Sequence, residues 1–309
     1  MLIFSIIFSV FIVAILLIGY YFFSIAFVKH NLGDSENLND PINAHLEKYK
    51  DTISKGIDFI NSEPYREVFI SSFDGKKMAA KYFYYGGDKS IILMHGYRSS
   101  ASRDFSCAVG MYKAFGFNVL LCDQRSHGKS EGIIITFGIK ESYDVKLWAD
   151  FLTEKFSQKN IVLGGMSMGS STILLSLDHK LPDTVKAIIA DCGFTSAREI
   201  IEIVGKRKFK INPRPILPLL NLYCLVFGRF SLFSKTCVDT VKKAKIPILL
   251  IHGKDDSFVP FEMSQQIYNA NKNIKLLAVD GAEHGLSYLI DRKKVESTIK
   301  EFLKNNNLY

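Results

Sequence analysis

The hydrophobic pattern divides the chain into a long apolar N-terminal run and an alternating region behind it. From Leu2 to Val28 there is no charged side chain. This run exceeds the ~20 residues that a helix needs to cross the roughly 30 Å hydrocarbon core of a bilayer. Tyr20 and Tyr21 lie toward one end, where amphipathic rings prefer the headgroup level. We therefore predict a transmembrane anchor over residues 1–28 and a single-pass membrane location.

A cleaved signal peptide is the alternative for this segment, because Ser24-Ile25-Ala26 has the small-x-small form of a cleavage site. The apolar stretch, however, is longer than the roughly 7–15 residues of a signal-peptide core, and no Lys or Arg precedes it. A retained anchor is therefore favoured. Lys29 directly follows the run, and by the positive-inside rule this positive charge weakly favours a cytoplasmic location of the remaining chain. The side of the membrane stays open at this point.

Residues 29–63 are predicted to form a linker that leads into a short amphipathic helix, because the chain is polar from Asn31 to about Glu63. Beyond Pro64 the pattern alternates between strands and helices. Two runs flank Asp74-Gly75, which is a hairpin signal. The predicted strands are Glu67–Ser72, Lys77–Tyr85, Ser90–Met94, Asn118–Cys122, Asn160–Gly164, Val185–Ala190, Pro247–Ile251 and Ile274–Val279. The predicted helices are Arg103–Phe115, Glu141–Phe156, Gly169–Leu177, Glu262–Ala270 and Arg292–Lys304.

Strands that alternate with helices predict an α/β domain over residues 64–309. Its sheet is expected to be mostly parallel, with helices on both faces, and to be entered through the antiparallel hairpin. Unbroken apolar runs such as Ser90–Met94 are typical of strands buried on both faces. Ligands of such sheets bind beyond the carboxyl ends of the strands. Chemistry is therefore to be sought in the loops that follow the strands.

One of these loops carries the sequence Gly165-Met166-Ser167-Met168-Gly169. It follows a predicted strand and opens a helix rich in small residues, which is the context in which G-x-S-x-G presents a nucleophilic serine. The glycines permit a tight turn that lifts the serine oxygen above the sheet edge. Ser167 is therefore the predicted nucleophile. An incidental Gly/Ser turn is the alternative, and the flanking elements disfavour it.

A serine hydroxyl needs a base to take its proton and an acid to orient that base. In this arrangement the partners follow the serine in the order Asp or Glu, then His. Among the seven histidines, His284 is the one that follows a late strand, in Gly281-Ala282-Glu283-His284-Gly285. His95, His127 and His252 come too early or in the wrong loop. Asp255 and Asp256 both follow the preceding strand, so the residues alone leave two candidates for the acid.

With these motifs the chain resembles the α/β-hydrolases, in particular a bacterial, membrane-anchored branch similar to serine aminopeptidases and acyl-thioester hydrolases. The resemblance covers roughly Tyr65 to Leu303. It is carried by the segments His95-Gly96-Tyr97, DQRSHGKS at 123–130, GMSMG at 165–169, HGKDDSFVP at 252–260 and GAEHG at 281–285.

The resemblance implies an α/β-hydrolase fold and assigns further roles. The acid of the family stands in the pattern D-x-x-V-P, which selects Asp256. The oxyanion hole is expected to consist of the backbone N–H groups of Tyr97 and Met168, and such donors are worth about 3–4 kcal/mol each in a transition state. Ser126 stands where the family usually has glycine, in a loop away from the expected triad. His95, Arg125 and His127 are interpreted as loop-orienting residues.

Composition narrows the picture in two ways. The chain has 39 Lys and Arg against 31 Asp and Glu, a net charge of +8. The window from Phe194 to Lys245 has an excess of the same size, with eleven basic and three acidic residues, so the remainder is close to neutral. This local excess argues against a general nucleic-acid binder. The five cysteines form no CxxC pair, and neither a metal site nor a disulfide framework is predicted.

The basic window, about residues 194–245, lies between two strands, where the resembling fold commonly carries a cap over the active site, and it is interpreted as such a cap insertion. Its central stretch Ile216–Phe233 holds one charge in eighteen residues, and Pro218 and Gly228 argue against a second membrane span. These apolar residues either form the core of the cap or present an apolar, cation-rimmed face to the bilayer or to an acyl chain.

Three functions follow from the sequence. The first is hydrolysis of a carboxylic ester or thioester, with a small-molecule or lipid-like acyl substrate. The second is a serine peptidase, resembling an aminopeptidase, on the same triad. The third is a non-catalytic binding protein on a hydrolase scaffold, which is disfavoured because every triad position is filled. No cofactor is predicted, because a serine triad supplies its own acid–base chemistry.

Overall fold

The computed structural model describes residues 1–30, 38, 46–210 and 212–309. Its centre is one sheet with the strand order β1-β2-β4-β3-β5-β6-β7-β8. Strand β2 is antiparallel to its neighbours β1 and β4, and the strands from β4 to β8 run parallel. The strands are β1 (Arg66–Ser71), β2 (Lys77–Phe83), β3 (Lys89–Met94), β4 (Asn118–Cys122), β5 (Asn160–Met166), β6 (Val185–Asp191), β7 (Ile248–Gly253) and β8 (Ile274–Val279).

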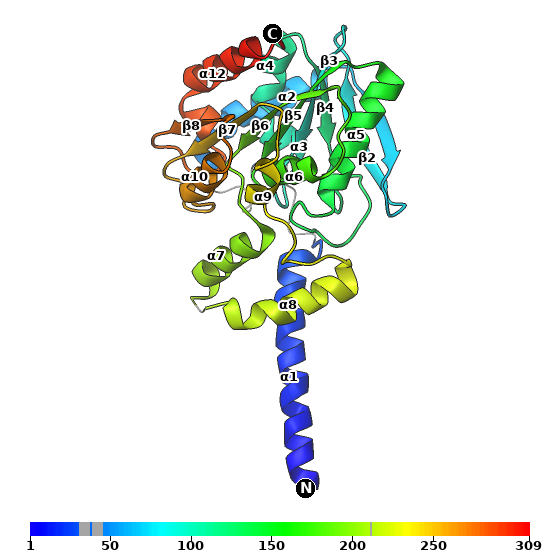
Figure 1. Cartoon of the computed structure of the whole chain (residues 1–309), viewed down its shortest axis with the longest axis vertical. Helices are drawn as coiled ribbons and strands as arrows, with labels where there is room; N and C mark the ends of the chain where they lie inside the picture. The colour runs from blue at the N-terminus through cyan, green and yellow to red at the C-terminus, as the bar shows by residue number, and fades with distance from the viewer. Residues whose placement is uncertain (31–37, 39–45, 211) are drawn as a thin grey trace.

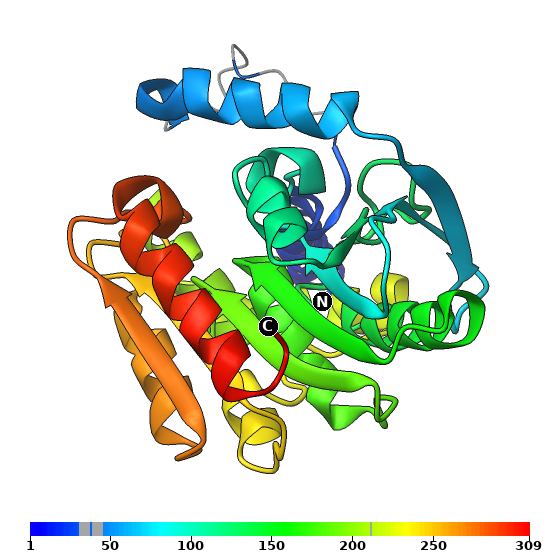
Figure 2. The ribbon, with the colours of Figure 1, turned by 90° about the horizontal axis from the view of Figure 1, so that it is seen from above.

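Helices cover both faces of this sheet, and two apolar layers result (Figure 2). The helices are α1 (Leu2–Phe27), α2 (Lys50–Ser62), α3 (Ala101–Asp104), α4 (Ala108–Ala114), α5 (Glu141–Phe156), α6 (Met168–Leu175), α7 (Ala197–Phe209), α8 (Leu217–Tyr223), α9 (Cys237–Val241), α10 (Phe261–Asn269), α11 (Ser287–Ile290) and α12 (Arg292–Asn305). A π-helical turn, Cys224–Gly228, continues α8. Because side chains alternate along a strand, Ile92 faces the layer of α5 and α6 while Ile91 faces that of α4 and α12.

The predicted α/β-hydrolase fold is confirmed, with the expected hairpin, parallel sheet and two helical layers. One predicted helix is wrong in detail. The stretch Arg103–Phe115 is divided into α3 and α4, because the turn at 105–107 interrupts the helical hydrogen bonding. The predicted linker falls largely on residues 31–37 and 39–45, which lie outside the described residues, whereas the amphipathic helix behind it is α2, whose buried face consists of Ile53, Ile57 and Ile60.

The N-terminal helix α1 extends out of the body of the molecule (Figure 1). Its 26 residues form one helix that is long and apolar enough to cross a membrane. Its last turn does not stand free, because Phe23 and Phe27 are buried against the domain. The backbone then forms a bridge between Val28 and Ile134. The apolar segment is therefore a projecting helix whose C-terminal end is part of the domain.

The basic insertion between β6 and β7 comprises α7, α8 and α9, and its parts lie in different places. Helices α7 and α8 lie beside α1, below the sheet in the view of Figure 1. Helix α9 packs on the sheet instead, where Cys237 and Val241 join the layer that also contains Trp148. The separate cap is thus shorter than residues 194–245.

Candidate active site

The loop after β5 holds Ser167 in a strained conformation. Its φ of 53° and ψ of −117° lie where L-residues are rarely found, which is a conformation held in place only by its surroundings. Gly169 permits this turn because a Cβ there would lie 1.8 Å from the carbonyl oxygen of Met94. Helix α6 can therefore begin directly behind the serine and pass close to β3. The side chain of Ser167 is left at the carboxyl end of the sheet.

Ser167, His284 and Asp256 form a continuous hydrogen-bonded chain. The Nε2 atom of His284 lies 2.9 Å from Ser167 Oγ, and its Nδ1 atom lies 2.7 Å from Asp256 Oδ2. Although burial alone raises the pKa of Asp256, hydrogen bonds from His252 and His284 hold that pKa well below its usual range. The carboxylate is therefore charged at neutral pH and fixes His284 with a proton on Nδ1, which leaves Nε2 free to accept the serine proton.

The structure also distinguishes the two neighbouring aspartates. Asp256 is buried, and its Oδ1 atom accepts the backbone N–H groups of Phe258 at 2.8 Å and Val259 at 2.7 Å. Asp255 is exposed. Of the two aspartates, Asp256 is therefore the one whose carboxylate faces His284.

His252 is a residue of this site that the sequence interpretation set aside. Its Nε2 atom lies 3.1 Å from Asp256 Oδ2 and 3.0 Å from the carbonyl oxygen of Val259. Both of these atoms are acceptors, so Nε2 carries the proton, and Nδ1 accepts from Ser264 Oγ at 2.6 Å. His252 is fully buried and contacts the same carboxylate oxygen of Asp256 as His284 does. Its position at the end of β7, four residues before Asp256, was the signal for this contact.

The loop after β3 contains Tyr97, and its neighbours orient it. His127 Nε2 accepts the backbone N–H of Arg98 at 3.0 Å, and His95 Nε2 accepts that of Gln124 at 3.1 Å. Burial lowers the pKa of His127 to about 3, so its ring is neutral and acts as an acceptor. The histidines therefore shape the loops. The main-chain N–H of Met168 belongs to the first residue of α6, where helical amides have no partner within their own helix.

Arg125 is buried in a structural ion pair away from the triad. Its guanidinium donates to both carboxylate oxygens of Asp144, at 2.9 and 3.0 Å, and to Asp74 at 3.1 Å. Ser126 has a left-handed φ of 67°, the region that favours glycine, and its hydroxyl donates to the carbonyl of Ile134. That hydrogen bond ties the loop at the position where the resembling family has glycine.

Known proteins share both the sequence and the architecture of this chain. Residues 87–215 match the family model for serine aminopeptidase S33, and residues 231–308 match the model for TAP-like protein. An esterase from Pyrococcus furiosus superposes with a TM-score of 0.65 and 28% identity, over 79% of this chain and 93% of the esterase. The chain belongs to the α/β-hydrolase superfamily.

Two further relatives of this hydrolase are an uncharacterized bacterial protein and a lipase. An uncharacterized Bacillus subtilis protein, YqkD, is 27% identical over 220 residues, which is 71% of this chain and 72% of that protein. The lysophosphatidylserine lipase ABHD12 of Danio rerio is 24% identical over 200 residues, which is 60% of this chain and 48% of the lipase. These likenesses support hydrolase activity and leave the substrate class to the chemistry of the site.

A cavity of about 830 Å³ opens beside Ser167 and His284 in this hydrolase. Its lining is mainly apolar and includes Ile53 of α2, Met111 of α4 and Ile299 of α12. Its volume is within the range of sites for drug-sized ligands, which is roughly 300–1,000 Å³. Among the described residues, none from 194 to 245 lines it. The cap expected over the active site therefore does not form the wall of this cavity, and α2 does.

Asp191 is an acidic residue of the hydrolase cavity that the sequence interpretation did not select. It ends β6, and its carbonyl oxygen accepts the backbone N–H of Ser167 at 2.9 Å. Burial and the neighbouring Asp256 raise the pKa of Asp191 to about 6, against the opposing influence of His252 and His284. A carboxyl group of this kind changes charge between weakly acidic and neutral pH.

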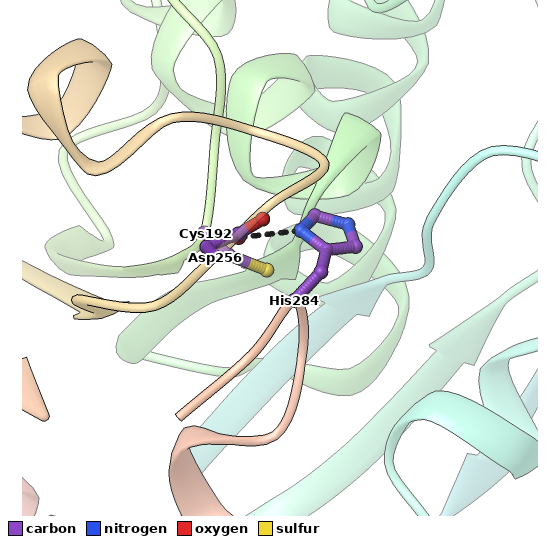
Figure 3. Close-up of side chains that lie close together, drawn as sticks. All are labelled: Cys192, Asp256 and His284. Atoms are coloured by element: carbon purple, nitrogen blue, oxygen red, sulfur yellow. Dashed lines mark hydrogen bonds and ion pairs between the residues drawn. The ribbon is translucent and has the colours of Figure 1, made fainter. Parts of the chain in front are cut away.

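Cys192, Asp256 and His284 lie close enough together to suggest a metal site, with potential ligand atoms within 4.8 Å of one another (Figure 3). Their chemistry favours the triad instead. Both ring nitrogens of His284 are already hydrogen-bonded, one to Asp256 and one to Ser167. Burial raises the pKa of the Cys192 thiol well above its usual value, whereas metals bind thiolates. The hydrogen bonding of these side chains is therefore explained without an ion.

Proposed function

We propose that this chain is a serine hydrolase that cleaves a carboxylic ester or thioester through an acyl-enzyme. Ser167 Oγ attacks the carbonyl carbon while His284 Nε2 takes its proton, and Asp256 stabilises the resulting imidazolium. The leaving alcohol or thiol receives that proton from His284. Water then attacks the acyl-enzyme by the same route and releases the acid. The observation that carries this proposal is the hydrogen-bonded chain from Ser167 through His284 to Asp256.

The backbone N–H groups of Tyr97 and Met168 are proposed to bind the oxyanion of the tetrahedral intermediate. Tyr97 lines the cavity beside Ser167, and Met168 directly follows the serine at the start of α6. Helix N-termini present unpaired amides and a partial positive charge, both of which favour an anion. The largely apolar cavity suits the hydrocarbon part of an acyl substrate. It favours lipid-like esters over short polar ones.

A serine peptidase is the second candidate, and two observations favour it. The matching family model is that of a serine aminopeptidase, and Asp191 places a carboxyl group in the cavity, where it could meet a substrate amine. Because the pKa of Asp191 is raised to about 6, however, its carboxyl group is charged over a narrower pH range than that of an ordinary aspartate. The mainly apolar lining favours the ester over the peptide.

We further propose that α1 is a retained, single-pass membrane anchor. A cleavage after Ala26 would remove Phe23, which is buried in the domain. It would also remove two carbonyl groups that the loop beside Ser167 uses as acceptors. The Tyr97 hydroxyl donates to the carbonyl of Ala26 at 2.8 Å, and Arg98 Nη2 donates to that of Ile25 at 2.8 Å. These contacts support a helix that stays attached.

Labelling with a fluorophosphonate tests the nucleophile in the full-length chain. The wild type and Ser257→Ala, a neighbouring serine at the cavity, are expected to label, whereas Ser167→Ala is not. Loss of the serine is expected to lower kcat by a factor on the order of 10⁶. A folded wild type that does not label, or a Ser167→Ala variant that labels equally, would contradict the proposal. Parallel assays with p-nitrophenyl esters of several lengths and with aminoacyl anilides distinguish esterase from peptidase.

A further inference from the structure

Helix α8 of the cap packs across the side of α1 (Figure 1). The approach is close at Gly19, where a Cβ would lie 2.3 Å from a methyl carbon of Leu219. Nearby, the Tyr223 hydroxyl donates to the backbone carbonyl of Leu16 at 2.7 Å. The ring of Phe23 also lies 5.8 Å from that of Tyr223. The position of α8 along α1 is therefore fixed by specific contacts near residues 16–23.

Part of the surface of α8 and its π-helical continuation is apolar and exposed, and it includes Phe227, whose ring also lies 5.7 Å from that of Phe23 on α1. The side chains of Leu222, Leu225, Val226 and Phe227 are exposed by 48, 48, 60 and 53% respectively. Leu217, Leu220 and Cys224 on the same segment are buried and form the core of the cap. The segment therefore has one set of apolar residues buried in the core of the cap and a second set exposed on its surface. We call the four exposed residues the apolar face of the cap.

The height of this face along α1 matches the surface of a bilayer. The part of α1 before Gly19 rises by roughly 26 Å at 1.5 Å per residue. That length is close to the roughly 30 Å hydrocarbon core. Tyr20 and Tyr21, which are exposed on α1, lie at the level where aromatic belts meet the headgroups. The apolar face of the cap consequently lies at the boundary between the acyl chains and the headgroups.

Basic side chains precede and follow the segment that carries this face. Lys206 and Lys208 stand in the last turn of α7, Lys210 follows them, and Arg229 follows the π-helical turn. All four are exposed. A second hollow, of about 640 Å³, is lined by Lys206, Arg207 and Lys210 together with Pro260. Cations at the edge of an apolar helix are typical of surfaces that bind anionic lipid headgroups while the apolar side chains enter the acyl region.

We propose that the apolar face of the cap inserts into the leaflet next to the domain, with the basic residues on anionic headgroups. The hydrolase is then held at two places, by α1 through the bilayer and by α8 in its surface. This inference rests on the proposed anchor and is independent of the chemistry at Ser167. Two attachment points would fix the orientation of the catalytic domain above the membrane, which a single helix leaves free to rotate.

Quenching of tryptophan fluorescence by brominated lipids tests the inference in the full-length chain. The protein has one tryptophan, Trp148, which is buried in the domain and supplies a constant background. Vesicles of phosphatidylcholine and phosphatidylglycerol, brominated in the upper acyl chain, are the probe. Phe227→Trp is expected to lose most of its added emission. Tyr268→Trp, an equally exposed ring position on α10, is expected to lose none.

Val10→Trp in α1 separates failure of the anchor from failure of the inference. If Phe227→Trp is as unquenched as Tyr268→Trp in a folded protein, the inference is overturned whatever Val10→Trp shows. If Phe227→Trp is quenched and Val10→Trp is not, the cap surface stands and the spanning helix is refuted. Equal quenching of Phe227→Trp with and without phosphatidylglycerol would overturn the role of the basic residues. Labelling of Ser167 by fluorophosphonate is read separately in every sample.

Discussion

The two sides of Ser167 differ in how they use apolar side chains. On one side Met168 joins a dense layer with the end of α1 and the cap. In this layer the ring of Phe137 lies 5.4 Å from that of Phe27 and 5.0 Å from that of Tyr97. On the other side, side chains of α2, α4 and α12 enclose a cavity of about 830 Å³. The first side is filled by the protein itself, and the second leaves space for a substrate.

The two sides therefore have different roles in the proposed site. The filled side holds the loop of Tyr97 and the start of α6, the two places from which oxyanion donors are proposed. The hollow side is where the acyl group is proposed to bind. Since a buried ring makes many close contacts, the filled side should respond to truncation mainly with a loss of stability. The hollow side should respond to added volume mainly with a change of substrate.

The largest effect is expected from Phe27→Ala on the filled side. Phe27 is fully buried, and truncation of a buried phenylalanine typically costs about 3–5 kcal/mol. The free energy of unfolding in detergent should fall by that amount. Phe11→Ala, on the exposed part of the same helix, is the matched control and should leave it unchanged. Equal effects of the two substitutions would show that α1 is merely tethered to the domain.

A smaller effect is expected from Asp191→Asn at the floor of the hollow side. The pKa of Asp191 is about 6 in the folded protein against 3.8 ordinarily, so the folded state binds more protons between these values. Wild-type stability should therefore fall as the pH rises from about 4 to about 6, and stay lowered above that. Asp191→Asn should be more stable than the wild type at pH 8 by about 3 kcal/mol.

Thermal or denaturant unfolding across this pH range measures the Asp191 effect, with both proteins compared in the same detergent. Near pH 4 the difference should vanish, because the wild-type carboxyl is then neutral in the folded state. A difference that does not depend on pH would mean that the substitution acts through packing or hydrogen bonding. A difference near zero at every pH would show that water in the cavity solvates Asp191 well.

The smallest effect, in free energy, is expected from filling the hollow side with Ala108→Trp. Ala108 is a half-buried residue at the start of α4 that lines the cavity. The ratio of kcat/KM for a long-chain over a short-chain p-nitrophenyl ester should fall by about tenfold or more. Ala114→Trp, at the exposed end of the same helix, should leave that ratio unchanged. An unchanged ratio in Ala108→Trp would place the acyl group elsewhere.

Sequence patterns predicted the sheet well because its strands are short, continuous apolar runs separated by clear breaks. Asn118–Cys122 and Ile274–Val279 begin and end where the pattern placed them. The positions of Ser167, Asp256 and His284 could be proposed because each follows a strand, and parallel strands deliver their loops to one edge. The chemistry of the loop residues and their order along the chain indicated Ser167 and His284, whereas the choice of Asp256 over Asp255 came from the family resemblance.

Other features depend on the three-dimensional arrangement of the chain and were not predicted from the local pattern. Nothing in the local pattern of α2 indicates that Ile53 lines a cavity beside Ser167. The bond of His252 to Asp256 requires the curvature of one particular loop. The cap was assigned to the active site by analogy, whereas its packing is decided by the rings of Phe23 and Tyr223 on α1 and α8.

The end of α1 has a consequence for how the protein is made. Its last carbonyl groups have no partners within the helix, and Arg98 and Tyr97 supply donors from about seventy residues further along the chain. The ribosome therefore synthesises the helix before it synthesises the residues that donate hydrogen bonds to it. We expect the helix to enter the membrane first and the domain to fold onto it afterwards. The loop beside the nucleophile would then be completed only at the membrane, so biosynthesis itself would restrict activity to that location.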